Sequence, residues 1–112
     1  MKKFQILLLL LASGCGGAQM LKTDSSASAI RAAEESGAEK VPRASLHLQL
    51  AKEEMDRAEK LQKSGEKEMA TSFLMRAEVD AELAVVLAHE QNEQAEAAQA
   101  IERVRTLKQE NR

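Results

Sequence analysis

The sequence has almost no aromatic residues: among 112 residues there is no Trp, no Tyr and only two Phe. It also has one Pro, five Gly and one Cys. The scarcity of side chains that favour a pleated surface argues against a β-sandwich or a β-barrel. A single cysteine excludes an internal disulfide.

An excess of charge of one sign is also missing. The chain has 16 Lys and Arg against 18 Asp and Glu, a net charge of −2. Without Lys2 and Lys3 the balance is 14 against 18, or about −4. A mildly acidic chain without a basic stripe is a poor candidate for binding nucleic acid. We therefore expect no nucleic-acid partner.

The first residues resemble a bacterial lipoprotein signal. A positively charged start precedes an apolar run over residues 6–12, which is too short to cross a bilayer as a permanent helix. The run ends in Ala12-Ser13-Gly14-Cys15. The resemblance implies cleavage after residue 14 and lipidation of Cys15, with palmitate among the expected acyl groups. The alternative is an ordinary signal peptide with an incidental cysteine.

The residue after Cys15 predicts where the protein is sorted. It is Gly16, whereas Asp at this place holds enterobacterial lipoproteins in the inner membrane. By that resemblance we expect a protein of the cell envelope, lipid-anchored in the outer membrane and facing the periplasm. Each buried acyl CH₂ contributes about 0.8 kcal/mol, so a multiply acylated cysteine is a firm anchor to the membrane.

Glycine, serine and proline divide the rest of the chain. We predict a signal peptide over 1–14, a lipidated flexible tether over 15–25 and a helical domain over 26–112. A short first helix ends before Gly37, and Pro42 starts a second helix that runs to about residue 63. After Ser64-Gly65 a long helix covers about residues 66–108.

Alanines seven residues apart predict how the second and third helices pack. They are Ala44, Ala51 and Ala58, followed by Ala70, Ala77 and Ala84. Folding the chain at Gly65 brings alanine opposite alanine in every layer, with residue numbers that sum to about 128. The predicted fold class is therefore all-α: an antiparallel, alanine-rich helical hairpin with a short additional N-terminal helix and a long C-terminal helix.

The long helix has a second apolar stripe, roughly opposite the alanines, formed by Met75, Val79, Leu83 and Val86. A hairpin alone would leave this stripe in water, so we interpret it as an interaction face.

The position of the first helix is open between two arrangements. In the favoured one it is a kinked arm that brings Ile30 near Ala100 and Ala33 near Ala97. In the other it folds back beside Met75, Val79 and Val86 as a compact three-helix bundle. A poorly ordered C-terminal third is a further alternative.

Residues typical of catalysis or metal binding are scarce. His47 and His89 are the only histidines, and in the hairpin register they lie too far apart to share a metal. No Gly-x-Ser-x-Gly motif and no zincin motif occurs. We expect no enzyme activity, no cofactor and no metal.

The chain resembles a family of bacterial envelope proteins known as domain of unknown function 4398. The resemblance rests on Ala27, Ile30, Ala33, Gly37-Ala38, Pro42, Leu46, Leu50-Ala51, Ala58, Gly65 and the alanines from Ala70 to Ala88. It implies an exported lipoprotein with a helical hairpin and brings no catalytic residues. Some members carry an OmpA-type peptidoglycan-binding domain, which is absent from this sequence.

These observations favour a structural or protein-interaction module in the periplasm. Its expected contacts are the membrane, through the lipid, and a periplasmic protein or a second copy of the chain. The alternative is an accessory subunit, or a carrier of lipid or another small ligand, in an envelope enzyme or transport complex.

Overall fold

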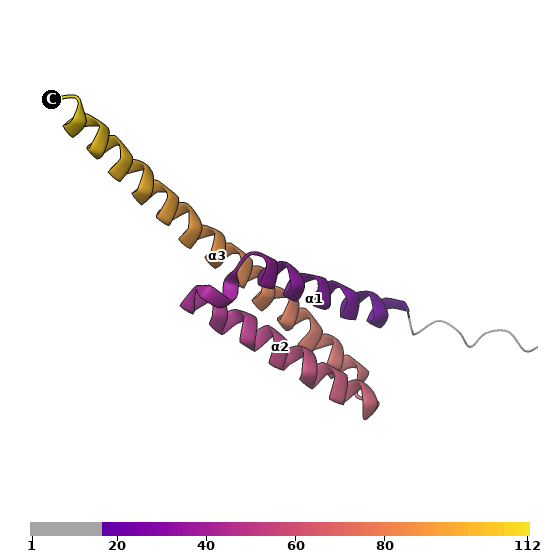
Figure 1. The fold of residues 1–112 in the computed structure, drawn as a ribbon. Helices are drawn as coiled ribbons and strands as arrows, with labels where there is room; N and C mark the ends of the chain where they lie inside the picture. Colours follow the sequence, from indigo (N-terminus) through magenta and orange to yellow (C-terminus); the bar gives the residue numbers. More distant parts are fainter. Residues whose placement is uncertain (1–16) are drawn as a thin grey trace, which may run out of the picture.

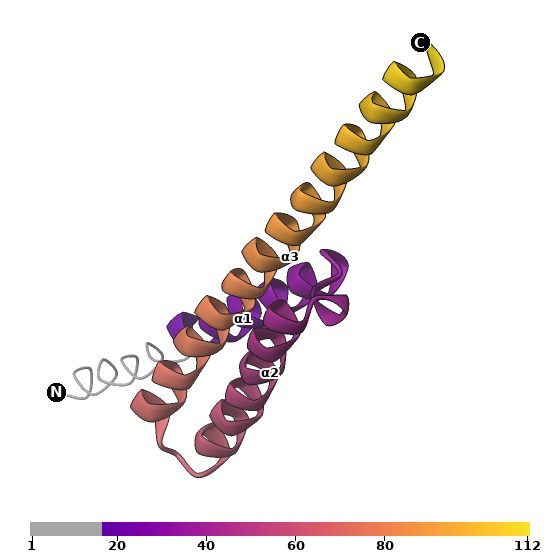
Figure 2. The ribbon, with the colours of Figure 1, turned by 90° about the vertical axis from the view of Figure 1, so that its left-hand side faces the viewer.

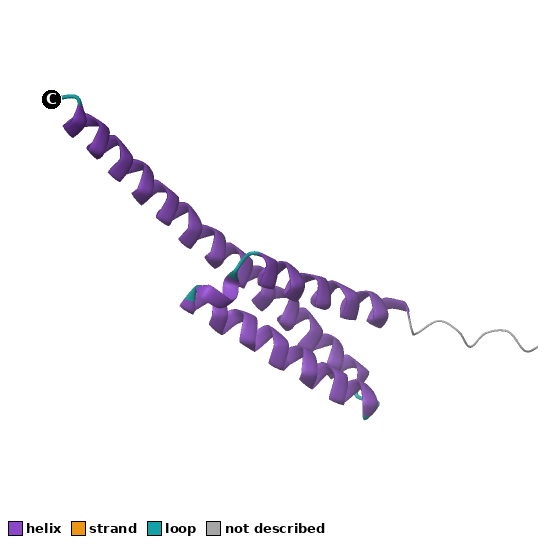
Figure 3. Ribbon diagram, in the orientation of Figure 1, coloured by secondary structure: helices purple, strands orange, loops and turns teal. Residues whose placement is uncertain are grey.

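The computed structural model of the chain describes residues 17–112, with side chains from residue 22 onward. The helices follow in the order α1 Gly17–Glu35, the short 3₁₀ helix η1 Ala38–Lys40, α2 Pro42–Lys63 and α3 Lys67–Glu110 (Figure 1). Figure 3 shows helices joined by short loops, and no strand, throughout this part of the chain. The prediction of an all-α fold is confirmed.

Two glycines and one proline determine where the helices end. Gly37 follows α1 with a φ of 79°, and Gly65 lies between α2 and α3 with a φ of 83°. Both angles fall in the left-handed region, which glycine adopts readily because it has no Cβ. Pro42 is the first residue of α2, where its missing N–H removes no helical hydrogen bond. The helix boundaries therefore follow from local chemistry.

α2 and α3 lie side by side and run in opposite directions from the turn at Gly65 (Figure 2). The six alanines that the sequence predicts at the contact have no exposed surface: Ala44, Ala51, Ala58, Ala70, Ala77 and Ala84. Because methyl groups are small, the distance between the two helix axes can be near the lower limit of the usual range of about 8–10 Å. Two contacts between the helices set their register. They join His47 to Asp80 and Glu54 to Arg76.

α1 packs lengthwise on the other two helices, mainly on α3. The hydroxyl of the fully buried Ser26 lies 2.8 Å from the carbonyl oxygen of Leu74. One turn further along, Ile30 is buried in the same core cluster as Ala84 and Ala88. Residue numbers therefore rise together along the two helices, so α1 runs parallel to α3 and antiparallel to α2.

This position of α1 overturns the predicted kinked arm. That arrangement required Ile30 near Ala100 and Ala33 near Ala97. Ile30 and Ala33 are instead buried in the core, and the two C-terminal alanines are exposed. The reason lies in the turn at Gly37 and η1, which reverses the chain and brings α1 back along the hairpin.

The alternative arrangement is right in that the first helix folds back onto the other two. Its predicted place beside Met75, Val79 and Val86 is wrong. These three side chains remain at least half exposed. α1 instead covers a face of α3 that includes Ala81 and Ala88, both without exposed surface. The small side chains on that face allow a closer approach than the larger side chains of the stripe.

The structure also corrects the predicted tether over 15–25. α1 begins at Gly17, so residues 17–25 are helical. The polar side chains that suggested a linker bond to the other helices: Ser25 donates to Glu78, and Thr23 accepts from Gln62. The predicted signal over 1–14, the lipidated Cys15 and Gly16 lie outside the described residues.

The last part of α3 extends past the other helices (Figures 1 and 2). Every residue from 89 to 112 is exposed, although the helix continues to Glu110. We call residues 89–112 the arm. Its helical residues are about 30 Å long at about 1.5 Å per residue. The C-terminal third is thus an ordered helix that the bundle does not cover.

Candidate interaction surface

The predicted stripe on α3 is a row of exposed apolar side chains on the bundle, where Leu46, Leu50 and Met69 are also exposed. The exposed fraction is 50% for Met75, 63% for Val79, 39% for Leu83 and 61% for Val86. Residues spaced three and four apart lie on one side of a helix. The two other helices cover the remaining sides of α3, so the stripe faces away from the core. These four residues are brought together as the sequence predicted; their role as an interaction face stays a prediction.

The stripe continues onto the arm after a polar interruption at Glu90 and Glu93. At helical spacing, Ala97, Ile101 and Val104 lie on the same side as Val86. Ile101 and Val104 are both more than half exposed. One face of α3 is thus apolar over most of its length, with carboxylates near its middle.

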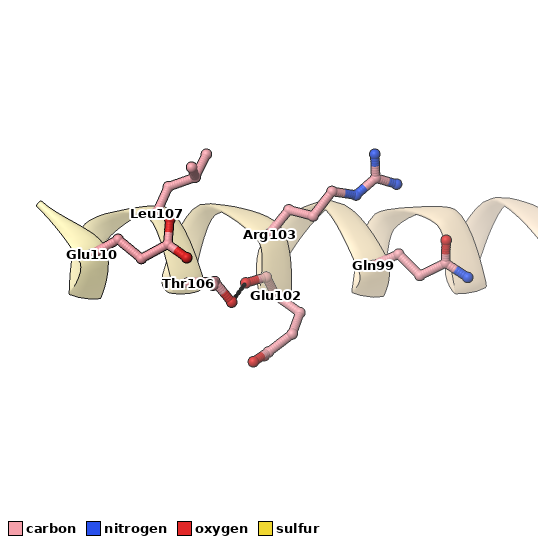
Figure 4. Close-up of a pocket in the computed structure, with 6 residues that line it drawn as sticks. All are labelled: Gln99, Glu102, Arg103, Thr106, Leu107 and Glu110. Carbon is pink, nitrogen blue, oxygen red and sulfur yellow. Dashed lines mark hydrogen bonds between the residues drawn. The ribbon is translucent and has the colours of Figure 1, made fainter.

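Two shallow depressions on α3 are too open to enclose a small ligand. One, of about 360 Å³, is lined by Ser72, Met75, Arg76, Val79 and Asp80. The other, of about 520 Å³, is lined by Gln99, Glu102, Arg103, Thr106, Leu107 and Glu110 (Figure 4). Figure 4 shows these six side chains on a single helix, pointing outward in different directions. Because one helix lines each depression, neither has an opposite wall.

A group of charged side chains lies along the edge between α2 and α3. His47 Nδ1 is 2.8 Å from Asp80 Oδ1, and Arg76 Nε is 2.9 Å from Glu54 Oε1. We call these four residues the charged edge. Beside them the guanidinium carbon atoms of Arg57 and Arg76 lie 5.3 Å and 5.2 Å from the centre of the Phe73 ring. The aromatic ring is therefore in cation–π range of two arginines.

Glu54 is the most constrained member of the charged edge. Its side chain is 11% exposed, and Oε2 is buried without a hydrogen-bond partner among the described residues. Burial raises the pKa of the Glu54 carboxyl; Arg76 opposes this rise, and Asp80 adds to it. The ion pair with Arg76 thus compensates the burial of the carboxylate only in part.

Two further ion pairs tie α1 and η1 to α2. Lys52 Nζ lies 2.6 Å from Glu34 and 3.7 Å from Glu39. The hydrogen bond to Glu34 raises the pKa of Lys52. Because these side chains are substantially exposed, solvent weakens the attraction, and the pairs serve mainly to orient the helices.

The charged edge is the feature that the sequence analysis missed. His47 is half-buried and pairs with Asp80, a partner that the sequence analysis did not name. The signal was present in the hairpin register, because residues beside the alanine seam of one helix meet those of the other. Among residues 17–112 no three His, Cys, Asp or Glu side chains are grouped as metal ligands. His89 is exposed at the start of the arm.

The comparison with protein families gives a match over most of the described chain. A model described as Domain of unknown function (DUF4398) matches residues 22–100. The chain belongs to the DUF4398 family. Curated proteins and solved structures gave no match. The matched segment of this DUF4398 protein contains the stripe, the charged edge and the first half of the arm.

The described helices do not include a membrane span: none combines the required length with the required apolarity. The stripe on α3 is broken by charged residues, and its apolar side chains occupy one side of the helix. Chemically, the surface of this DUF4398 protein is suited to binding another helix along α3.

Proposed function

We propose that this DUF4398 protein is an envelope lipoprotein, anchored through Cys15 in the outer membrane, whose helical domain is a structural or protein-interaction module in the periplasm. The single observation that carries the proposal is the exposed apolar face of α3, from Met75 to Val104. Large apolar side chains exposed in a row are typical of a protein interface.

The scaffold for this function is the alanine-rich antiparallel hairpin of α2 and α3, stiffened by α1. Thr23 of α1 contacts Gln62 near the end of α2, so the start of α1 lies at the turn end of the hairpin. The arm extends from the opposite end (Figure 1). A lipid on Cys15, two residues before α1, therefore holds the turn end at the membrane.

The alternative function, as a carrier of lipid or another small ligand, has less support. It requires a concavity that removes most of the ligand from water. The depression beside Met75 and Val79 is lined by α3 alone. The other part of this alternative, an accessory subunit that binds its complex through α3, would use the same exposed face. It differs from the proposed function only in the partner that the face binds.

Replacement of the anchor residue tests the lipoprotein assignment. We expect Cys15→Ser to remain an uncleaved precursor and to lose labelling by radioactive palmitate in cells. The matched control is Ser28→Ala on the exposed side of α1, which should be cleaved and labelled like the natural chain. Equal labelling of Cys15→Ser would refute the anchor.

Photo-crosslinking in cells tests the interaction face. A photoreactive amino acid at Val79 or Ile101 should give defined crosslinked products. The control position is Gln99, which is exposed on the arm but lies off the stripe. The same products from Gln99, or none from Val79 and Ile101, would argue against an interaction module.

A further inference from the structure

The arm has two halves of opposite charge. Residues 90–96 contain three Glu and no Lys or Arg, whereas residues 103–112 contain four Lys and Arg and one Glu. The exposed apolar residues Ala97, Ala100 and Ile101 lie between the two halves, and the exposed Val104 lies at the start of the basic half. We propose that the arm pairs in antiparallel orientation with the arm of a second copy of this chain.

Antiparallel pairing brings every part of the arm opposite a complementary part. With the centre of the pair between residues 100 and 101, Ala97 lies opposite the partner's Val104, and a small residue meets a larger one. Glu93 then lies opposite the partner's Lys108. On the two edges, Glu96 meets the partner's Arg103 and Glu90 meets the partner's Arg112. The acidic half of each copy thus faces the basic half of the other.

Parallel pairing is disfavoured by the same residues. It would place Glu93 against the partner's Glu93 and Lys108 against the partner's Lys108. Glu93 lies near the middle of the stripe, so its repulsion would act inside the contact, where water screens it least. The charge pattern therefore favours the antiparallel orientation of two copies over the parallel one.

The state of the arm gives a second reason for a partner. An isolated helix of fewer than about 12–15 residues is marginal in water, and longer ones depend on packing for most of their stability. The arm has no packing of its own in the bundle, and its internal charged contact is the exposed pair of Arg105 and Glu102 at 3.0 Å. A second arm would bury the apolar face along the length of the arm.

This inference rests on the proposed function and identifies the interaction partner as a second copy of the chain. Each copy's α1 starts at the turn end of its bundle, so the two N-terminal ends lie at opposite ends of the dimer. Lipids at both ends would hold such a dimer along the membrane surface rather than upright.

Charge exchange in the arm tests the pairing in solution. The chain of residues 17–112, which holds every helix and core residue that the structure describes, is followed by sedimentation velocity over a concentration series. Glu93→Lys with Glu96→Lys should weaken self-association by at least about tenfold, and so should Arg103→Glu with Lys108→Glu. An equal mixture of the two variants should associate again. Glu53→Lys with Glu59→Lys on α2 makes the same charge change as the first variant and should leave association intact.

Cysteine pairing tests the orientation. Residues 17–112 contain no natural cysteine. A mixture of Ala97→Cys and Val104→Cys chains should form a mixed disulfide efficiently, whereas either chain alone should not. Gln99→Cys, off the stripe, is the control. Disulfides within each single variant at the same rate as in the mixture would show parallel pairing and overturn the proposal.

The outcomes separate this inference from the proposed function. A natural chain that stays monomeric at all concentrations overturns the pairing of arms. If stripe positions then still crosslink to another protein in cells, the interaction module stands and its partner is a different protein. If association persists in both charge variants, the contact lies elsewhere on the molecule and the arm is not its site.

Discussion

At the scale of single residues, Glu54 is the clearest case of a side chain whose environment opposes its charge. The carboxylate is packed against the hairpin, and only Oε1 has a cationic partner, Arg76. The pKa of Glu54 is raised by burial, so the folded chain binds a proton more readily than the unfolded chain does. Stability contributed at this site therefore falls as pH rises from the unfolded pKa through the folded pKa.

Glu54→Gln should stabilise the protein at neutral pH. The neutral amide removes a poorly solvated charge and can donate to Asp80, for a gain on the order of 1 kcal/mol. The gain should shrink as pH falls, because the natural carboxyl becomes protonated. Urea unfolding at a series of pH values measures it, with the exposed Glu53→Gln as control. A gain that does not depend on pH would contradict the assigned cause.

The alanine seam makes single residues important in a different way. Ala51 has no exposed surface, and its methyl group lies where α2 and α3 approach. Ala51→Leu should therefore overpack the contact and lower the free energy of unfolding by about 1–3 kcal/mol.

Ala32→Leu on α1 is the matched control for the seam, because Ala32 is exposed and should tolerate the larger side chain. Ala29 packs against the core and is unsuitable as a control. Equal melting temperatures for Ala51→Leu and Ala32→Leu would show that the seam is not tightly packed.

At the scale of helices, α1 is held by a few specific contacts. Its hydrophobic side chains are few, and the buried Ser26 occupies a contact position where a larger residue would not fit. The Ser26 hydroxyl can donate to the carbonyl oxygen of Leu74 or to that of Lys22, each at 2.8 Å. A buried polar group is tolerated when it has such partners.

Ser26→Leu should detach α1 from the hairpin or strain its contact. We expect a loss of about 1–3 kcal/mol, together with faster trypsin cleavage within α1 at Lys22 or Arg31. Ser28→Leu, two positions along on the exposed side of the same helix, should change neither stability nor cleavage. Equal cleavage of both variants would contradict the position of Ser26 in the contact.

At the scale of the whole molecule, burial is distributed unevenly along the chain. The core cluster draws on α1, η1, α2 and the first half of α3, whereas no residue from 89 to 112 is buried. Local opening needs least free energy where few apolar contacts are lost. The bundle and the arm are therefore expected to differ in stability although one continuous helix joins them.

Hydrogen exchange should show this division directly. At concentrations low enough to keep the arms apart, amides of residues 92–110 should exchange much faster than those of residues 70–88. At concentrations that favour pairing, the arm should gain protection, and Glu93→Lys with Glu96→Lys should remove that gain. Uniform protection along α3 at all concentrations would contradict an uncovered arm.

The sequence by itself determined the class of fold and the breaks between helices. Gly37, Pro42 and Gly65 act through their own backbone chemistry, which does not depend on distant residues. The sequence also showed the seven-residue spacing of alanines and the stripe from Met75 to Val86, because residues on one side of a helix recur with a fixed period. The exposure of the stripe could be predicted for this reason, and its role as an interaction face stays a prediction.

Tertiary structure alone decided where α1 lies and which polar side chains are paired. Thr23 and Ser25 looked like residues of a linker, because short polar side chains favour loops until a neighbouring helix supplies their partners. The partner of His47 and the burial of Glu54 depend on how two helices meet. Such contacts join residues far apart in the chain. They contribute free energy only when the two helices pack at a particular distance and register, which no local sequence pattern specifies.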